Sequence, residues 1–119
     1  MADEPIAEAG TYMLDGPQLL LPPEHVQAMS MAIHELATNA AKYAALSTHE
    51  GRLTVRWRRD GDKTVTVRWA EDGGPHVQPP EREGFGSRLI AQLARRIGGA
   101  VRYDWRPGGL SAELDCRLD

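Results

Sequence analysis

The segment from Glu24 to Ala45 contains neither glycine nor proline and is rich in alanine, with two methionines and one leucine. It therefore predicts one long helix, and no other segment constrains the fold as strongly. Pro22 and Pro23 suit the first turn of such a helix, and Glu24 favours the positive end of its dipole. The helix is expected to end before a polar stretch that leads to Gly51.

Strands are predicted in pairs around glycine-containing turns, and both main pairs are expected to form hairpins. The first pair is Arg52–Arg58 and Lys63–Ala70 around Asp60-Gly61, and the second is Ala100–Trp105 and Leu110–Leu118 around Pro107-Gly108-Gly109. The remaining elements are two brief strands, Thr11–Leu14 and Gln18–Leu21, and a second helix, Phe85–Ile97, which Gly98 ends. Trp57, Trp69 and Trp105 fall on strands and are expected to pack against the sheet.

This order of elements predicts an α+β fold. Consecutive strands pair as hairpins and few helices intervene, so we expect a two-layer α/β sandwich with a mixed, mainly antiparallel sheet and helices on one face. The 119 residues suffice for one domain. We expect residues 1–10 to be a flexible lead-in or the remnant of a linker, and residues 11–119 to form the domain.

Composition argues against several classes of protein. The net charge of −3 does not suit a dedicated nucleic-acid binder. No apolar run is long enough to cross a membrane, so we expect no membrane contact by this segment. The amino terminus lacks the basic start and apolar core of a signal peptide. The single cysteine, Cys116, excludes an internal disulfide and agrees with the cytoplasmic location that we expect.

Polar residues form a stripe along one flank of the long helix. The residues expected to face the core, at about 100° per residue, are Met29, Ile33, Leu36, Ala40 and Tyr43. Glu35, Asn39 and Lys42 fall within roughly 60° of one another, about a quarter turn from that apolar stripe. Asparagine is a poor helix former, so Asn39 needs a reason to be there. The three side chains can line a cleft, although a solvated helix face also fits this pattern.

Two glycine-containing segments can complete such a cleft. Trp69-Ala70-Glu71-Asp72-Gly73-Gly74-Pro75 ends a strand, where a carboxylate can accept from an exocyclic amine and glycines let backbone approach a flat ring. Gly84-Phe85-Gly86-Ser87 leads into a helix, whose first amide groups form an anion site. Taken alone, each segment is explained by a structural turn.

Together, the three segments resemble bacterial histidine kinases. His34-Glu35-Leu36-Ala37-Thr38-Asn39-Ala40-Ala41-Lys42-Tyr43 resembles their N box, and the two glycine-containing segments resemble their first and second glycine boxes. A histidine in the N box together with Trp-x-Glu in the first glycine box is the mark of the HWE subfamily. The resemblance runs from about Gly16 to the carboxy terminus. It implies the catalytic domain of a sensor histidine kinase, with the sandwich fold of the GHKL ATPase superfamily.

The resemblance also implies ATP and Mg²⁺ as ligands and gives roles to the residues. Asn39 would hold Mg²⁺, Glu35 would lie near the γ-phosphate as base or orienter of the attacking imidazole, and Lys42 would pair with phosphate. Glu71 would accept from the adenine amine, and Gly73 would let adenine approach. The other nucleotide-binding positions would be Tyr43, Gly84, Phe85, Gly86 and Ser87, and Pro75–Glu83 would form the lid.

The chain departs from that family in two ways. Position 44 is alanine where the subfamily usually carries glycine, which we expect to be tolerated. The upstream helical segment with the phosphoaccepting histidine is missing, so the isolated chain is expected to be a monomer that binds ATP without completing autophosphorylation alone. Its partners would be a phosphoacceptor histidine domain, of its own protein or in trans, and a downstream response regulator.

Other interpretations stay open at this point. An anti-sigma-factor-like serine kinase would also bind ATP, but Trp-x-Glu argues against it. A non-catalytic module that uses the sandwich for nucleotide or protein contacts is disfavoured by the intact polar stripe and glycine segments. His34 also begins a resemblance to a phosphoacceptor box, but Asn39 stands where that box has proline, so a surface or packing histidine is favoured.

Overall fold

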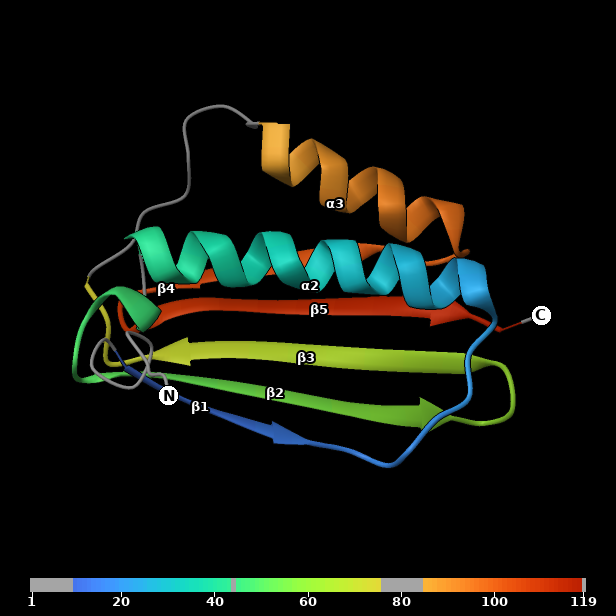
Figure 1. Ribbon diagram of the computed structural model, residues 1–119, viewed down its shortest axis with the longest axis horizontal. Helices are drawn as coiled ribbons and strands as arrows, with labels where there is room; N and C mark the ends of the chain where they lie inside the picture. Colours follow the sequence, from blue (N-terminus) through green and yellow to red (C-terminus); the bar gives the residue numbers. More distant parts are fainter. Residues whose placement is uncertain (1–9, 44, 76–84, 119) are drawn as a thin grey trace, which may run out of the picture.

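Five strands form one sheet in the order β1-β2-β3-β5-β4, and the two long helices cover one of its faces (Figure 1). The computed structural model describes residues 10–43, 45–75 and 85–118. The strands are β1 (Gly10–Asp15), β2 (Gly51–Asp60), β3 (Thr64–Asp72), β4 (Val101–Arg106) and β5 (Gly109–Arg117). The helices are α2 (Pro23–Tyr43) and α3 (Phe85–Arg96), with a short 3-10 helix, η1 (Ala45–Ser47), after α2.

The strand pairing confirms the predicted α+β sandwich with a mixed, mainly antiparallel sheet. β1 pairs with β2 in parallel, whereas the β2–β3, β3–β5 and β5–β4 pairs are antiparallel. Both predicted hairpins are present. The first turns at Gly61, whose φ of 69° favours a residue without a side chain, and the second turns just before Gly109, whose φ is 147°.

The predicted strand at Gln18–Leu21 is wrong. These residues lie in the irregular connection between β1 and α2. Leu19 and Leu21 pack against the core, while Leu20 is 91% exposed. Alternating burial in a connection therefore imitates the period of a strand, although no ladder of backbone hydrogen bonds forms there.

The core lies between the helices and the sheet, and on α2 it is centred on small residues. Ala28, Ala32, Leu36 and Ala40 are at most 3% exposed. Leu36 and Ala40 were predicted to face the core, as they do. The predicted Met29 and Ile33 also pack against the core, but they are only half-buried and line an apolar groove beside Leu14 and Trp57. The alanines are buried instead because α3 packs alongside α2, and small side chains let two helices approach closely.

The other predicted core and boundary residues agree with the structure. Trp69 and Cys116 are buried, and Trp57 and Trp105 are half-buried on their strands. Gly98 ends α3 with a φ of 77°, and the Gly98 amide donates to the Arg95 carbonyl at 3.1 Å. Of the expected lead-in, Gly10 begins β1 and the rest lies outside the described residues. Neither α2 nor α3 is long and apolar enough to cross a membrane.

Candidate functional site

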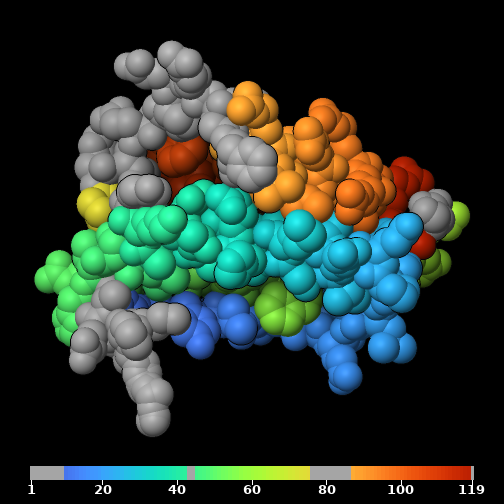
Figure 2. Space-filling view, turned by 45° about the horizontal axis from the view of Figure 1, so that its top comes forward, coloured from blue at the N-terminus to red at the C-terminus, as the bar shows by residue number. Residues whose placement is uncertain are grey.

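Three segments that are distant in the sequence meet at one end of the sandwich. The carboxy-terminal end of α2, the end of β3 and the beginning of α3 all lie toward the same end of the sheet (Figure 1). Between the second half of α2 and the start of α3, atoms of the β4–β5 region are visible at the bottom of a recess (Figure 2). The structure thus brings the predicted helix stripe and both glycine-containing segments to one place.

The polar stripe of α2 lies on the flank that faces this recess. Met29 and Ile33 line the apolar groove on the β1–β2 side of the helix, so the opposite flank faces α3. Glu35 is half-buried on that opposite flank, and Asn39 and Lys42 are exposed there. The structure therefore agrees with the predicted position of the stripe at the edge of the buried face.

Asn39 projects from α2 in nearly the same direction as a residue that is buried earlier on the helix. Eleven residues along an α-helix bring a side chain back to within about 20° of its starting direction, so Asn39 projects nearly as Ala28 does. Ala28 is 0% exposed, whereas Asn39 is exposed. The difference comes from what lies beside the helix, because α3 begins only partway along α2 and leaves the second half uncovered by a helix (Figure 1).

The second glycine-containing segment is described in part. Phe85 and Gly86 form the beginning of α3, where the first amide groups of a helix have no partner within the helix. Ser87 follows in the first turn and is half-buried. Gly84 and the predicted lid after Pro75 lie outside the described residues, as do the side chains of Phe85 and Tyr43.

Glu71 is a buried carboxylate with two donors from its own chain. It is 3% exposed at the end of β3. The indole N–H of Trp69 donates to Glu71 Oε2 at 2.7 Å, and the amide of Ala45 donates to Glu71 Oε1 at 3.4 Å. Burial raises the pKa of Glu71 above its ordinary value, while the two hydrogen bonds lower the pKa and oppose that effect.

Glycines pack backbone against backbone around this carboxylate. Gly73 has a φ of 73°, and a Cβ added to it would lie 2.5 Å from the carbonyl oxygen of Glu50. A Cβ on Gly109 would lie 2.6 Å from the carbonyl oxygen of Glu71. Gly73 was predicted to be near the base, so its contact with Glu50 adds a structural reason for glycine at that position.

Sequence reasoning missed three participants in this cluster: Trp69 as a donor, Ala45 and Gly109. Trp69 had a usable signal, because residues two apart on a strand point to the same face and a tryptophan there can reach a carboxylate. Ala45 and Gly109 had none, since each comes from a distant part of the chain.

His34 projects about 140° away from Asn39 around α2 and is exposed. It does not join the polar stripe. This agrees with the favoured interpretation of His34 as a surface residue.

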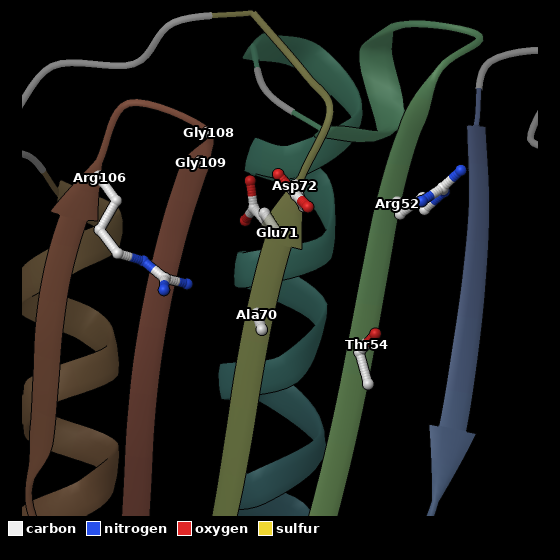
Figure 3. Close-up of a pocket in the computed structure, with 8 residues that line it drawn as sticks. All are labelled: Arg52, Thr54, Ala70, Glu71, Asp72, Arg106, Gly108 and Gly109. Carbon is white, nitrogen blue, oxygen red and sulfur yellow. The ribbon is translucent and has the colours of Figure 1, made fainter.

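A second hollow opens on the helix-free face of the sheet. Figure 3 shows its lining residues, Arg52, Thr54, Ala70, Glu71, Asp72, Arg106, Gly108 and Gly109. Arg106 lies across β5, whereas Arg52 points toward β1, so the two guanidinium groups do not converge on one ligand. No residue of α2 or α3 lines this hollow, which separates it from the recess.

No cluster of three or more histidine, cysteine, aspartate or glutamate side chains that could hold a metal ion occurs in the described ranges. The amide oxygen of Asn39 is a suitable protein ligand for a hard cation such as Mg²⁺.

Comparison with known proteins identifies a matching family. The family described as histidine kinase-like ATPase domain matches residues 16–113. Blue-light-activated histidine kinase 1 of Erythrobacter litoralis is 43% identical over 103 residues, which are 83% of this chain and 28% of that protein. The blue-light-activated histidine kinase of Brucella ovis is 40% identical over 110 residues, 89% of this chain and 22% of that protein. The chain thus spans about a quarter of these relatives.

Solved structures have the same fold. The histidine kinase domain of a blue-light-activated histidine kinase from Erythrobacter litoralis superposes with a TM-score of 0.79 at 21% identity, covering 92% of this chain and 55% of that one. A mycobacterial sensor histidine kinase superposes with a TM-score of 0.66 at 18% identity, covering 90% of this chain and 82% of that one.

Proposed function

The chain belongs to the family of histidine kinase-like ATPase domains, and on that premise we propose that it binds ATP with Mg²⁺ in the recess between α2 and α3. In this proposal it is the catalytic domain of a sensor histidine kinase and delivers the γ-phosphate to a histidine on another domain. His34 on α2 and the Trp69-x-Glu71 pattern on β3 support membership of the HWE subfamily.

The exposure of Asn39 is the single observation that carries the proposal. Its direction on α2 nearly matches that of the fully buried Ala28, and yet Asn39 is exposed. Asn39 lies on the side of α2 that is buried near Ala28, at a point that α3 does not cover (Figure 1). Neither helix propensity nor packing explains an asparagine at this position. A ligand that fills the recess explains both the residue type and the gap.

Asn39, Lys42 and Glu35 would act on the phosphates. The Asn39 amide oxygen would be the protein ligand of Mg²⁺, and the Lys42 ammonium would neutralise phosphate charge. Phosphoryl transfer depends chiefly on in-line positioning and charge neutralisation, which these groups can provide. Glu35, which is half-buried nearer the middle of α2, would orient the attacking imidazole or accept its proton.

The two glycine-containing segments would hold the rest of the nucleotide. Glu71 would accept from the adenine amine, with Gly73 beside the ring and Tyr43 lining the pocket. A carboxylate has about four acceptor positions, and the two internal donors leave room for a third. The amide groups of Phe85, Gly86 and Ser87 at the start of α3, together with that of Gly84, would bind phosphate oxygens.

The partners follow from this chemistry. A phosphoacceptor histidine domain would receive the phosphoryl group, and a response regulator would act downstream. Both would be partners of a whole kinase, of which this chain would be the catalytic domain.

Titration with ATP tests the site. We expect calorimetry to show ATP binding that depends on Mg²⁺, and we expect Asn39→Ala to abolish that dependence while leaving the circular dichroism spectrum unchanged. Gln27→Ala is the matched control, because Gln27 is an exposed amide near the start of the same helix. Unchanged ATP affinity in Asn39→Ala would count against the proposed site.

The chemistry of the product tests the reaction. With ATP and a separately prepared phosphoacceptor domain, the chain is expected to produce a phosphoramidate on histidine, which acid hydrolyses. An acid-stable phosphoester would identify a serine kinase instead. ATP binding without transfer to any acceptor would favour a non-catalytic module.

A further inference from the structure

Trp69 and Glu71 form a buried pair on one face of β3. Their positions are two apart along the strand, which is one strand repeat, so both side chains point toward the helix layer. The Trp69 N–H donates to Glu71 Oε2 at 2.7 Å, and both residues are at most 3% exposed. An indole N–H can only donate, so this bond exists only while Oε2 accepts.

We propose that Trp69 is a positioning residue that keeps the Glu71 carboxylate an acceptor toward the nucleobase and thereby makes the site prefer adenine to guanine. This inference rests on the proposed function. Adenine carries an amino donor at its 6-position, whereas guanine carries an oxygen acceptor there. A carboxylate with only acceptor positions binds the first group and repels the second.

The hydrogen bonds donated to Glu71 oppose the effect of burial on its pKa. Burial raises the pKa of Glu71, the Trp69 bond lowers it, and the longer Ala45 bond lowers it further. Removing the Trp69 N–H leaves Glu71 with the weaker donor alone, so its pKa would rise further. A protonated Glu71 presents a hydroxyl donor, which can donate to guanine O6 but cannot accept from the adenine amine at that oxygen.

Among the residues that the structure describes, no charged neighbour takes the role of the Trp69 indole. The titratable and charged groups on the elements around Glu71 are Lys42 at the end of α2, His49 and Glu50 before β2, Arg52 on β2, Asp72 on β3, and Arg106 on β4. None of them is among the causes that move the pKa of Glu71. The acceptor state of this carboxyl therefore depends on hydrogen bonds rather than on an ion pair.

The geometry of the pair is fixed by close backbone contacts. Gly109 leaves no space behind the Glu71 backbone, since a Cβ there would lie 2.6 Å from its carbonyl oxygen. The carboxylate can therefore adapt only by turning its side chain, which the Trp69 bond opposes. Trp69 thus acts through Glu71, without needing to touch the base itself.

Trp69→Phe is the decisive variant, because it keeps an aromatic ring and removes the donor. The matched control is Trp57→Phe, which removes an equivalent 2.7 Å bond, from Trp57 Nε1 to the Pro17 carbonyl, at the other end of the sheet. ATP and GTP affinities of both variants and of the unaltered chain would be measured by calorimetry between about pH 5 and 8, a range that lies above the ordinary pKa of a carboxyl group. The ratio of the two affinities is insensitive to a simple loss of stability.

We expect Trp69→Phe to lower the ATP-to-GTP affinity ratio by about tenfold, as for one lost hydrogen bond to a charged group. The fall in ATP affinity on acidification should also move to higher pH. Trp57→Phe should show neither change. Glu71→Gln should lower the ratio and remove its pH dependence, because an amide does not titrate in this range and the phosphate ionisation that ATP and GTP share cancels in the ratio.

Two results would overturn the inference while leaving nucleotide binding in place: an unchanged ratio, or an unchanged pH profile, in Trp69→Phe. A chain that binds no ATP at all would instead refute the proposed function. If Trp69→Phe does not fold, ¹⁵N spectra of the unaltered chain provide the test. The chemical shift of one indole N–H should change with pH over the same range in which ATP affinity changes, and this change should be lost in Glu71→Gln. If no indole signal behaves in this way, the role of Trp69 is refuted.

Discussion

Gly51 determines how closely the start of β2 approaches the turn that follows α2. A Cβ added at Gly51 would lie 1.5 Å from the carbonyl oxygen of Ala45, so backbone atoms already fill the space that a side chain needs. The amide of the same Ala45 donates to Glu71. This contact therefore supports the candidate site from behind.

Replacing Gly51 by alanine is expected to destabilise the fold by about 3 kcal/mol or more, because the backbone itself must move. Gly61→Ala is the control. Its φ of 69° is strained for alanine, but no atom lies within 4 Å of the added Cβ, so a cost of about 1 kcal/mol is expected. Urea unfolding of both variants measures the difference, and equal costs would show that Ala45 yields easily.

At this scale the sequence pointed to particular residue types, but it did not predict their contacts. Asn39 stood out because asparagine is unfavourable within a helix, and Glu71 because an acidic residue ends a strand beside glycines. The Ala45–Glu71 bond joins residues 26 positions apart, and no local pattern encodes such a contact. The roles of Glu35, Lys42 and Tyr43 remain predictions.

Three strands are tied together on the helix-free face of the sheet. Glu113 of β5 accepts from Arg68 of β3 at 2.8 Å and from Arg102 of β4, and Arg102 also reaches Asp115 at 3.2 Å. These two arginines lower the pKa of Glu113 to about 2. The arginine side chains are more than half exposed, so solvent screens the ion pairs and limits what they contribute to stability.

Glu113→Gln is expected to lose about 0.5–1 kcal/mol of stability at neutral pH. Because the pKa of Glu113 is lower in the folded state than in the unfolded state, its contribution is complete above pH 4.5 and disappears as the pH falls toward 2. The difference between variant and unaltered chain should therefore vanish near pH 2. Asp104→Asn, at a looser 3.9 Å pair, is the control, and a constant difference at all pH values would contradict the prediction.

Among the elements, hairpins and helices were predictable because their signals are local. Gly61 and Gly109 mark turns, and a glycine-free run marks α2. The side of α2 that faces the core was predicted less well, since large residues suggested Met29 and Ile33. The observed choice of Ala28 and Ala32 depends on α3, which lies far along the chain.

Ligand binding provides the test for the whole molecule. A ligand at a hundredfold excess over its dissociation constant should stabilise the fold by about 2.7 kcal/mol. We therefore expect ATP with Mg²⁺ to raise the midpoint of thermal unfolding, ATP with a chelator to raise it less, and Asn39→Ala to respond equally weakly in both conditions. An unchanged midpoint with saturating ATP and Mg²⁺ would exclude nucleotide binding by the folded domain.

The fold class was predictable at this scale, but the strand order was not. Nothing in the local pattern says that β1 lies parallel to β2, or that β5 rather than β4 is the inner strand of the second hairpin. Burial distinguishes them only afterwards. Leu110, Ala112, Leu114 and Cys116 make β5 a central strand, whereas β4 has no buried residue.

The parallel pairing of β1 has a mechanical consequence. Gly10 pairs with Gly51, and a Cβ added to Gly10 would lie 3.0 Å from the carbonyl oxygen of Thr48 and 3.2 Å from that of Ala45. β1 therefore enters the sheet at the end where the amide of Ala45 donates to Glu71. A force applied to the polypeptide at Gly10 would act on Gly51 through the strand pairing, and Gly51 lies against Ala45, whose amide donates to Glu71. Movement at the start of β1 would therefore reach the proposed nucleotide site through neighbouring backbone.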